Sequence, residues 1–141
     1  MFVRNAWYVA AWDHEITRSL KRRIILDDPV VLFRTDAGKP VALEDRCCHR
    51  QAPLSMGKLI GNVVKCPYHG LEFDSSGKCV KVPSQDMVPP NAKVRNFPVI
   101  EKNFHAEGLP LASPAANVTD AGKKIASFTP CTLGHRAQEV D

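Results

Sequence analysis

The sequence predicts an all-β protein, built as an antiparallel sandwich or barrel. Short runs rich in Val, Ile, Leu and Phe recur along the chain, and Gly, Pro, Asp or Ser separates them. Helical periodicity is weak, and the best helical candidate, residues 11–20, is short and contains β-branched residues. At 141 residues the chain has the size of one ordinary domain. We expect strands at residues 23–26, 30–34, 41–44, 60–65, 71–74, 78–82 and 94–100.

The first strands follow one another through tight turns. The Asp-Asp-Pro segment at 27–29 separates the runs 23–26 and 30–34, and it is predicted to be a turn because proline fixes φ. The Asp-Ala-Gly-Lys segment at 36–39 is a second turn. It leads into the run 41–44, so this part of the chain has the pattern of a hairpin.

The later strands enclose two loops that carry cysteine and histidine. The first box, Cys-Cys-His at 47–49, lies between the runs 41–44 and 60–65, and the second, Cys-Pro-Tyr-His at 66–69, lies between 60–65 and 71–74. A proline follows the first box and a glycine follows the second. We therefore expect a pair of loops at one end of a β scaffold, each supplying one Cys and one His.

Composition argues against several classes of function. The net charge of +4 is mild, and Lys and Arg are scattered without interleaved aromatic residues, so nucleic acid is not an expected partner. No stretch approaches the ~18 apolar residues of a membrane span, and the N-terminus lacks the features of a signal peptide. We therefore expect a cytoplasmic protein with reduced thiols and no membrane partner. Five cysteines is an odd number, and clustered Cys and His in such a protein favour metal over a disulfide framework.

The two boxes together offer four metal ligands. Tetrahedral zinc is one candidate, but a Cys2His2 zinc finger groups its cysteines and its histidines separately. A Rieske [2Fe–2S] centre, in which two Cys hold one iron and two His hold the other, explains the order Cys, His, Cys, His. One residue separates Cys47 from His49, so both side chains can point the same way, whereas those of Cys48 and His49 diverge. The predicted ligands are Cys47, His49, Cys66 and His69, with Cys48 as a spacer. The other His and Cys residues are isolated and are interpreted as surface or packing residues: His14, His105, His135, Cys79 and Cys131.

The sequence around these residues resembles a known family. The pattern C-x-H-R … C-x-Y-H-G-x-x-F-D-x-x-G is similar to the Rieske domain of aromatic ring-hydroxylating and O-demethylating oxygenases. Residues 2–12, FVRNAWYVAAW, resemble the start of the vanillate and dicamba O-demethylase and toluenesulfonate methyl-monooxygenase oxygenase components. The likeness runs from about residue 1 to residue 103. It implies a Rieske-type antiparallel β-sandwich with two cluster-binding loops at 1–103, followed by a divergent C-terminal tail at 104–141.

Two other Rieske classes fit the sequence less well. Respiratory-chain Rieske proteins carry an extra cysteine in each box, joined as a disulfide, and Tyr68 stands between Pro67 and His69 where that bridge would need a cysteine. Soluble Rieske ferredoxins are closer in size but lack the NAWYVA opening. Arg50 directly after the first histidine also fits the oxygenases better.

The resemblance implies a multi-component enzyme. A flavin- or ferredoxin-type reductase would supply single electrons to the [2Fe–2S] cluster, which would pass them to mononuclear Fe(II) in an oxygenase catalytic domain or neighbouring subunit. That iron needs two histidines and a carboxylate, and this sequence contains no D-x-x-H-x(3–5)-H element. We therefore expect an electron-transfer module that is not catalytic alone. A stand-alone Rieske-type ferredoxin is the alternative.

The tail and the basic residues lead to two further expectations. From about Phe104 the sequence departs from the family, and with three Pro, three Gly and no sustained alternation it is not expected to supply a strand. Truncation or a shifted reading frame would explain the departure, and a natural linker is the alternative. Four basic residues near the boxes would either steer an acidic reductase or simply be solvated: Arg46, Arg50, Lys58 and Lys65.

Overall fold

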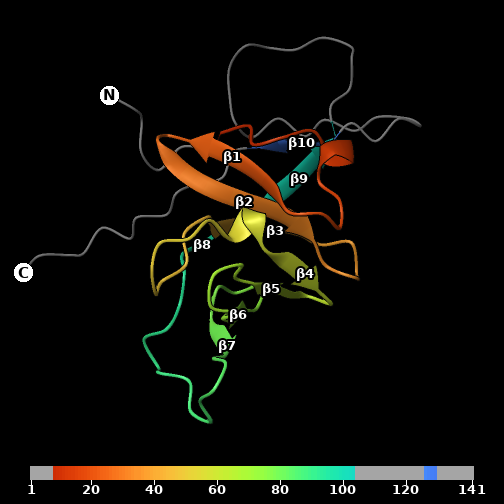
Figure 1. Cartoon of the computed structure of the whole chain (residues 1–141). Coiled ribbons are helices and arrows are strands. Elements are labelled where there is room, and N and C mark those ends of the chain that lie inside the picture. The colour runs from red at the N-terminus through yellow and green to blue at the C-terminus, as the bar shows by residue number, and fades with distance from the viewer. Residues whose placement is uncertain (1–7, 104–125, 130–141) are drawn as a thin grey trace, which may run out of the picture.

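The computed structural model describes residues 8–103 and 126–129, and nearly all of its regular structure is β (Figure 1). The predicted all-β class is confirmed. The helical elements in these two ranges are the short 3-10 turns η1 (Asp13–Glu15) and η2 (Leu54–Met56), and neither is long and apolar enough to cross a membrane. The strands are β1 (Lys21–Ile25), β2 (Asp28–Arg34), β3 (Pro40–Glu44), β4 (Lys58–Ile60), β5 (Val63–Lys65), β6 (Glu72–Phe73), β7 (Cys79–Lys81), β8 (Asn96–Phe97), β9 (Ile100–Asn103) and β10 (Ala126–Thr129).

The first sheet contains β1, β2, β3 and β8, in that order and all antiparallel. Strand β2 is buried on both faces, because its alternating side chains enter two different cores. Val31 and Phe33 pack into the core that lies next to the two Cys/His boxes. Val30 and Leu32 pack with Phe97 into a second core on the opposite face.

The second sheet contains β4, β5, β6 and β7 and is smaller. It lies beside one face of the first sheet, below it in the view of Figure 1. Leu54, Val64 and Phe73 are fully buried and join Val31 and Phe33 in one core. This shared core fixes the second sheet to the first, and the two Cys/His boxes lie between β3 and β4 and between β5 and β6.

The first turn lies at other residues than predicted, and the weak helical segment forms only a short turn. The first turn is at Leu26 and Asp27, whose φ angles are 52° and 66°, so Pro29 lies inside β2 rather than in the turn. Pro29 is tolerated there because pairing of β2 with β3 begins only at Val30. In the range 11–20, where the weak helical pattern lies, the structure has only the 3-10 turn η1.

Two predicted strands are each divided in the structure. Residues 60–65 contribute to a hairpin of β4 and β5, because the chain turns at Gly61, where φ is 56°. Residues 94–100 contribute to β8 and β9, with Pro98 between them. The sequence pattern located these β segments, but it did not show where each strand ends.

Strand β10 contradicts one expectation about the tail. Residues 126–129 form a strand that pairs antiparallel with β9, although the composition of the tail argued against any strand. A physical reason is the open edge of β9, whose N–H and C=O groups can pair with an extended segment of almost any composition. Residues 104–125 and 130–141 lie outside the described residues, so the domain boundary after residue 103 stays a prediction.

Candidate metal centre

The first cysteine loop, residues 47–52, is a closed turn. The Cys47 N–H donates to the Ala52 carbonyl at 2.8 Å, and the Gln51 N–H donates back to the Cys47 carbonyl at 2.9 Å. Gln51 adopts φ 57°, which reverses the chain after the histidine. These hydrogen bonds and the reversal at Gln51 set the direction in which Cys47 and His49 leave the backbone.

The second cysteine loop, residues 66–71, repeats this pattern. The Cys66 N–H donates to the Leu71 carbonyl at 2.7 Å, and the Gly70 N–H donates to the Cys66 carbonyl at 3.2 Å. Gly70 adopts φ 77° at the position equivalent to Gln51 of the first loop. The two loops are thus equivalent in backbone structure although their sequences differ.

Cysteines and histidines occupy different environments in these loops. Cys47 and Cys66 are 1% and 3% exposed and belong to the main core. His49 and His69 are both exposed, and their ring centroids lie 4.8 Å apart. Two short loops therefore present a buried pair of thiols and an exposed pair of imidazoles.

The Cys47 thiol is strongly affected by its surroundings. Burial is the main cause that raises the pKa of this thiol above its usual value, and the adjacent Cys66 thiol raises it further. A thiol of this kind stays protonated at neutral pH until a metal takes the place of its proton. Metal binding at this pair should therefore release protons.

The four predicted ligands lie as two pairs, the thiols of Cys47 and Cys66 and the imidazoles of His49 and His69. Among residues 8–103 and 126–129, no three Cys, His, Asp or Glu side chains converge as the ligands of a single ion would. A zinc site needs four donors around one point, whereas a two-iron cluster needs a pair of donors at each iron. The buried thiol pair and the exposed imidazole pair match the donor pairs of the binuclear group.

The other cysteines near the boxes differ from this pair. Cys48 is exposed, and its thiol approaches both Cys47 and the main chain of Lys93. Its proximity to Cys47 means that geometry does not by itself decide between the two cysteines. Cys79 is 1% exposed and its sulfur contacts the Lys81 carbonyl at 3.4 Å, which agrees with a packing role.

A third loop flanks the histidines and was not found from the sequence. Residues 82–92 follow β7 and form, together with the two cysteine loops, a cavity of about 550 Å³. The signal was its composition, VPSQDMVPPNA, which contains three prolines and no strand pattern. The cavity is lined by Cys48, His49, His69, Leu71, Val82, Pro83, Ser84, Gln85, Pro89, Asn91 and Ala92.

Arg18 connects the second sheet to the first. Its guanidinium donates to the Gly61 carbonyl at 2.6 Å and to the Arg34 carbonyl at 2.9 Å, and it forms an ion pair with Asp36 at 2.8 Å. Asn62 accepts from the same guanidinium at 3.3 Å. These contacts join the β4–β5 turn to the end of β2 and so help to position the cysteine loops.

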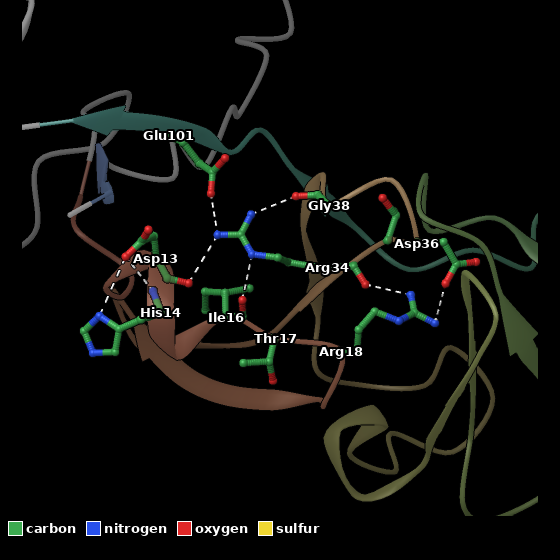
Figure 2. A pocket seen from close by; sticks show the side chains of 10 residues that line it. Asp13, His14, Ile16, Thr17, Arg18, Arg34, Asp36, Gly38 and Glu101 are labelled. Carbon is green, nitrogen blue, oxygen red and sulfur yellow. Dashed lines mark hydrogen bonds and ion pairs between the residues drawn. The ribbon is translucent and has the colours of Figure 1, made fainter. Parts of the chain in front are cut away.

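A larger cavity of about 700 Å³ lies beside Arg18 and Arg34 (Figure 2). Figure 2 shows the Arg34 guanidinium surrounded by acceptors of the protein itself. It donates to the carbonyls of Ile16 and Gly38 at 2.7 and 2.8 Å and pairs with Glu101. Both arginines are therefore occupied by contacts with other residues of the described chain.

Comparison with known proteins agrees with the geometry of the two loops. The profile of the Rieske [2Fe-2S] domain matches residues 6–98. The chain belongs to the Rieske [2Fe-2S] domain family. The cofactor of this Rieske domain is a [2Fe–2S] cluster, and the paired thiols and imidazoles suit it.

Relatives of this Rieske chain are oxygenase components. It is 52% identical over 104 residues to the toluene-4-sulfonate monooxygenase system iron-sulfur subunit of Comamonas testosteroni, covering 73% of this chain and 30% of that protein. It is 40% identical over 101 residues to the vanillate O-demethylase oxygenase subunit of Pseudomonas sp. (strain HR199 / DSM 7063), covering 72% and 27%. The structure of dicamba monooxygenase with non-heme iron and dicamba matches with a TM-score of 0.68 and 50% identity, over 70% of this chain and 31% of that one.

The coverage values show that the match lies within one part of each relative. The chain spans about 30% of the length of the curated relatives it matches, and the matched part is their Rieske domain. The predicted resemblance to the toluenesulfonate, dicamba and vanillate oxygenase components is confirmed.

Proposed function

We propose that this chain is the electron-transfer module of a two-component aromatic oxygenase, with the cluster held by Cys47, His49, Cys66 and His69. The observation that carries the proposal is the division of the four side chains into a buried thiol pair and an exposed imidazole pair. The cluster, when bound, supplies a one-electron carrier. The thiols anchor it in the core, and the imidazoles form the edge that a partner can approach.

The segment that carries both cysteine loops and the second sheet is basic. Residues 46–93 contain seven Lys or Arg and three Asp or Glu, a net charge of +4, whereas eight basic and eight acidic residues balance in the rest of the described chain. Most basic side chains outside 46–93 form ion pairs, but within 46–93 the described structure has only the pair Lys81–Glu72, at 3.9 Å. The basic residues of this segment without an ion pair are Arg46, Arg50, Lys58, Lys65, Lys78 and Lys93.

This charge distribution supports an acidic redox partner. Uncompensated charge in one part of a protein speeds encounter with an oppositely charged partner, and salt screens the effect. We propose that a flavin- or ferredoxin-type reductase with an acidic docking face delivers electrons here. The electrons would then pass to mononuclear Fe(II) in an oxygenase catalytic domain or a neighbouring subunit. The cytoplasmic location expected from the sequence stays a prediction.

The steering claim can be tested with matched charge reversals. Lys58→Glu and Lys78→Glu change exposed side chains that have no ion pair in the described chain, whereas Lys39→Glu makes the same change in the turn between β2 and β3. Reduction of the unaltered protein by an acidic reductase, followed by stopped-flow absorbance, should slow with rising salt. At low salt it should be slower in Lys58→Glu and Lys78→Glu than in the unaltered protein, and unchanged in Lys39→Glu. A rate that does not change with salt, or an equal loss in Lys39→Glu, would remove the steering claim.

A chimera tests the proposed destination of the electrons. Residues 1–103 would replace the Rieske domain of the dicamba O-demethylase oxygenase component, to which this chain is 50% identical over 103 residues. With reductase and NADH the chimera should demethylate dicamba, and the same chimera with Cys47→Ser should not. A chimera that is reduced by the reductase but forms no product would favour the alternative, a stand-alone Rieske-type electron carrier.

A further inference from the structure

The two cysteine loops are closed by different means. The second loop lies between β5 and β6, and Lys65 pairs with Glu72 across its two ends. The first loop leaves the first sheet at β3 and enters the second sheet at β4, so no strand ladder joins its ends. Backbone hydrogen bonds close the first loop on itself, so a contact outside residues 47–52 must hold the segments before and after it together.

A buried carboxylate makes that contact. Asp45 is 1% exposed and is the buried charged residue of the described chain. Its Oδ1 accepts the Ser55 N–H at 2.6 Å, and its Oδ2 accepts the Ser55 hydroxyl at 2.7 Å. Arg22 approaches the same carboxylate from the outside at 3.3 Å, and the Asp45 N–H donates to the Pro29 carbonyl at 2.8 Å. These contacts tie both ends of the first loop to the first sheet.

The contact between Asp45 and Ser55 extends to the second loop. Two residues after Ser55, Gly57 lies against the backbone of Lys65, where an added methyl group would overlap the Lys65 carbonyl oxygen. Lys65 directly precedes Cys66 in the chain. A continuous path of contacts therefore runs from the start of the first loop to the start of the second.

We propose that Asp45 is a positioning residue that holds the two cysteine ligands at a fixed separation, through Ser55 and the Gly57–Lys65 contact. This inference rests on the proposed function, because it takes Cys47 and Cys66 as ligands. A buried carboxylate without donors is costly, and hydrogen bonds to a charged group are the strong ones, so Asp45 and Ser55 depend on each other. The carboxylate also places a negative charge two residues from Cys47, where it disfavours the extra electron of a reduced cluster.

The variants Ser55→Ala and Asp45→Asn test the proposal. Ser55→Ala removes one of the two hydrogen bonds and keeps the charge, whereas Asp45→Asn keeps the shape and removes the charge. Glu44→Gln is the matched control, because Glu44 is the neighbouring carboxylate and is bound to Arg95 at 3.1 Å instead of to the loop.

The first measurement is amide hydrogen exchange in the full chain as purified. The Gln51 and Gly70 amides donate within the first and second loops. Ser55→Ala and Asp45→Asn should speed exchange at both amides about tenfold, as the loss of one hydrogen bond to a charged group implies. Glu44→Gln should leave both rates unchanged. Unchanged exchange at Gly70 in both test variants would overturn the link between the loops.

The second measurement uses the protein with its cluster. Iron release to a chelator should be about tenfold faster in both test variants. The reduction potential should rise in Asp45→Asn but not in Ser55→Ala, a difference that a merely structural role would not produce. Equal potentials in the two variants would overturn the electrostatic effect of the Asp45 carboxylate, and unchanged iron release in both would overturn its positioning role. Absence of a [2Fe–2S] cluster from the unaltered protein would instead overturn the proposed function, and the exchange data would still decide the contact path.

Discussion

Replacing Gly57 with alanine should weaken both cysteine loops at once. An added methyl group would overlap the carbonyl oxygen of Lys65 and would lie 3.0 Å from the carbonyl oxygen of Leu54. Both obstacles are backbone atoms, so no side-chain rotation can relieve them. The segment around Gly57 and the start of the second loop must therefore move apart.

The expected cost is about 1–3 kcal/mol of unfolding free energy, as for other overpacked sites in a dense core. For a domain of this size each kcal/mol lowers the thermal midpoint by about 4–8 °C. Because the displaced carbonyl belongs to the residue before Cys66, iron retention should fall together with stability. Calorimetry of the metal-free protein and iron analysis of the purified holoprotein measure the two effects.

Gly61→Ala is the control for this change. Gly61 is in the β4–β5 turn and has a φ of 56°, and in the described part of the chain no atom beyond its two chain neighbours lies within 4 Å of the position that its Cβ would take. Alanine there should cost about 1 kcal/mol from the left-handed backbone, with iron content unchanged. If Gly57→Ala had the midpoint and iron content of the unaltered protein, the close approach of the two segments would be wrong.

Three further predictions follow from the site and its support. Cys47→Ser should abolish the visible absorption of the cluster, whereas Cys48→Ser should keep it; loss in both variants would refute the assignment of Cys48 as a spacer. The pKa of Glu15 is lowered from 4.5 to about 2, first of all by the hydrogen bond from Lys21. The stability that this gives is present above pH 4.5 and is lost as the pH falls toward 2. Urea unfolding midpoints of Glu15→Gln should therefore depend less on pH in this window than those of the unaltered protein, and identical slopes would count against the ion pair. The reduction potential should lie toward the low end of the Rieske range, roughly −150 to +300 mV, since no hydroxyl side chain directly after His69 can donate a hydrogen bond to a cluster sulfur. It should also fall as the pH rises. A value well above zero in voltammetry would contradict this.

The sequence was sufficient to predict the β class and the grouping of the boxes. Alternating apolar runs and turn residues showed where strands occur, and the order Cys, His, Cys, His was enough to suggest paired ligands. It was not sufficient to show that Val30 and Val31 enter different cores. A strand that is buried on both faces has no alternation of apolar and polar residues from which its two faces could be told apart.

The supports of the site could not be read from the sequence. Asp45 and Ser55 are ten residues apart and belong to no motif of local structure, so only the fold shows that they meet. The third loop has the composition of an ordinary linker, and its place beside the histidines follows from the pairing of Cys79 with Ala92 through their backbone groups at 2.9 Å. The strand β10 arises from a partner edge rather than from its own sequence.

The most direct test of the account is the metal and sulfide content of the purified chain and of its ligand variants. Protein made with sufficient iron should contain about two irons and two acid-labile sulfides per chain, as a Rieske centre requires. Single replacements of Cys47, His49, Cys66 and His69 should each abolish that content, whereas Cys48→Ser should preserve it. One zinc per chain without sulfide, or a full cluster that survives the loss of Cys47 or Cys66, would contradict the assignment of the site.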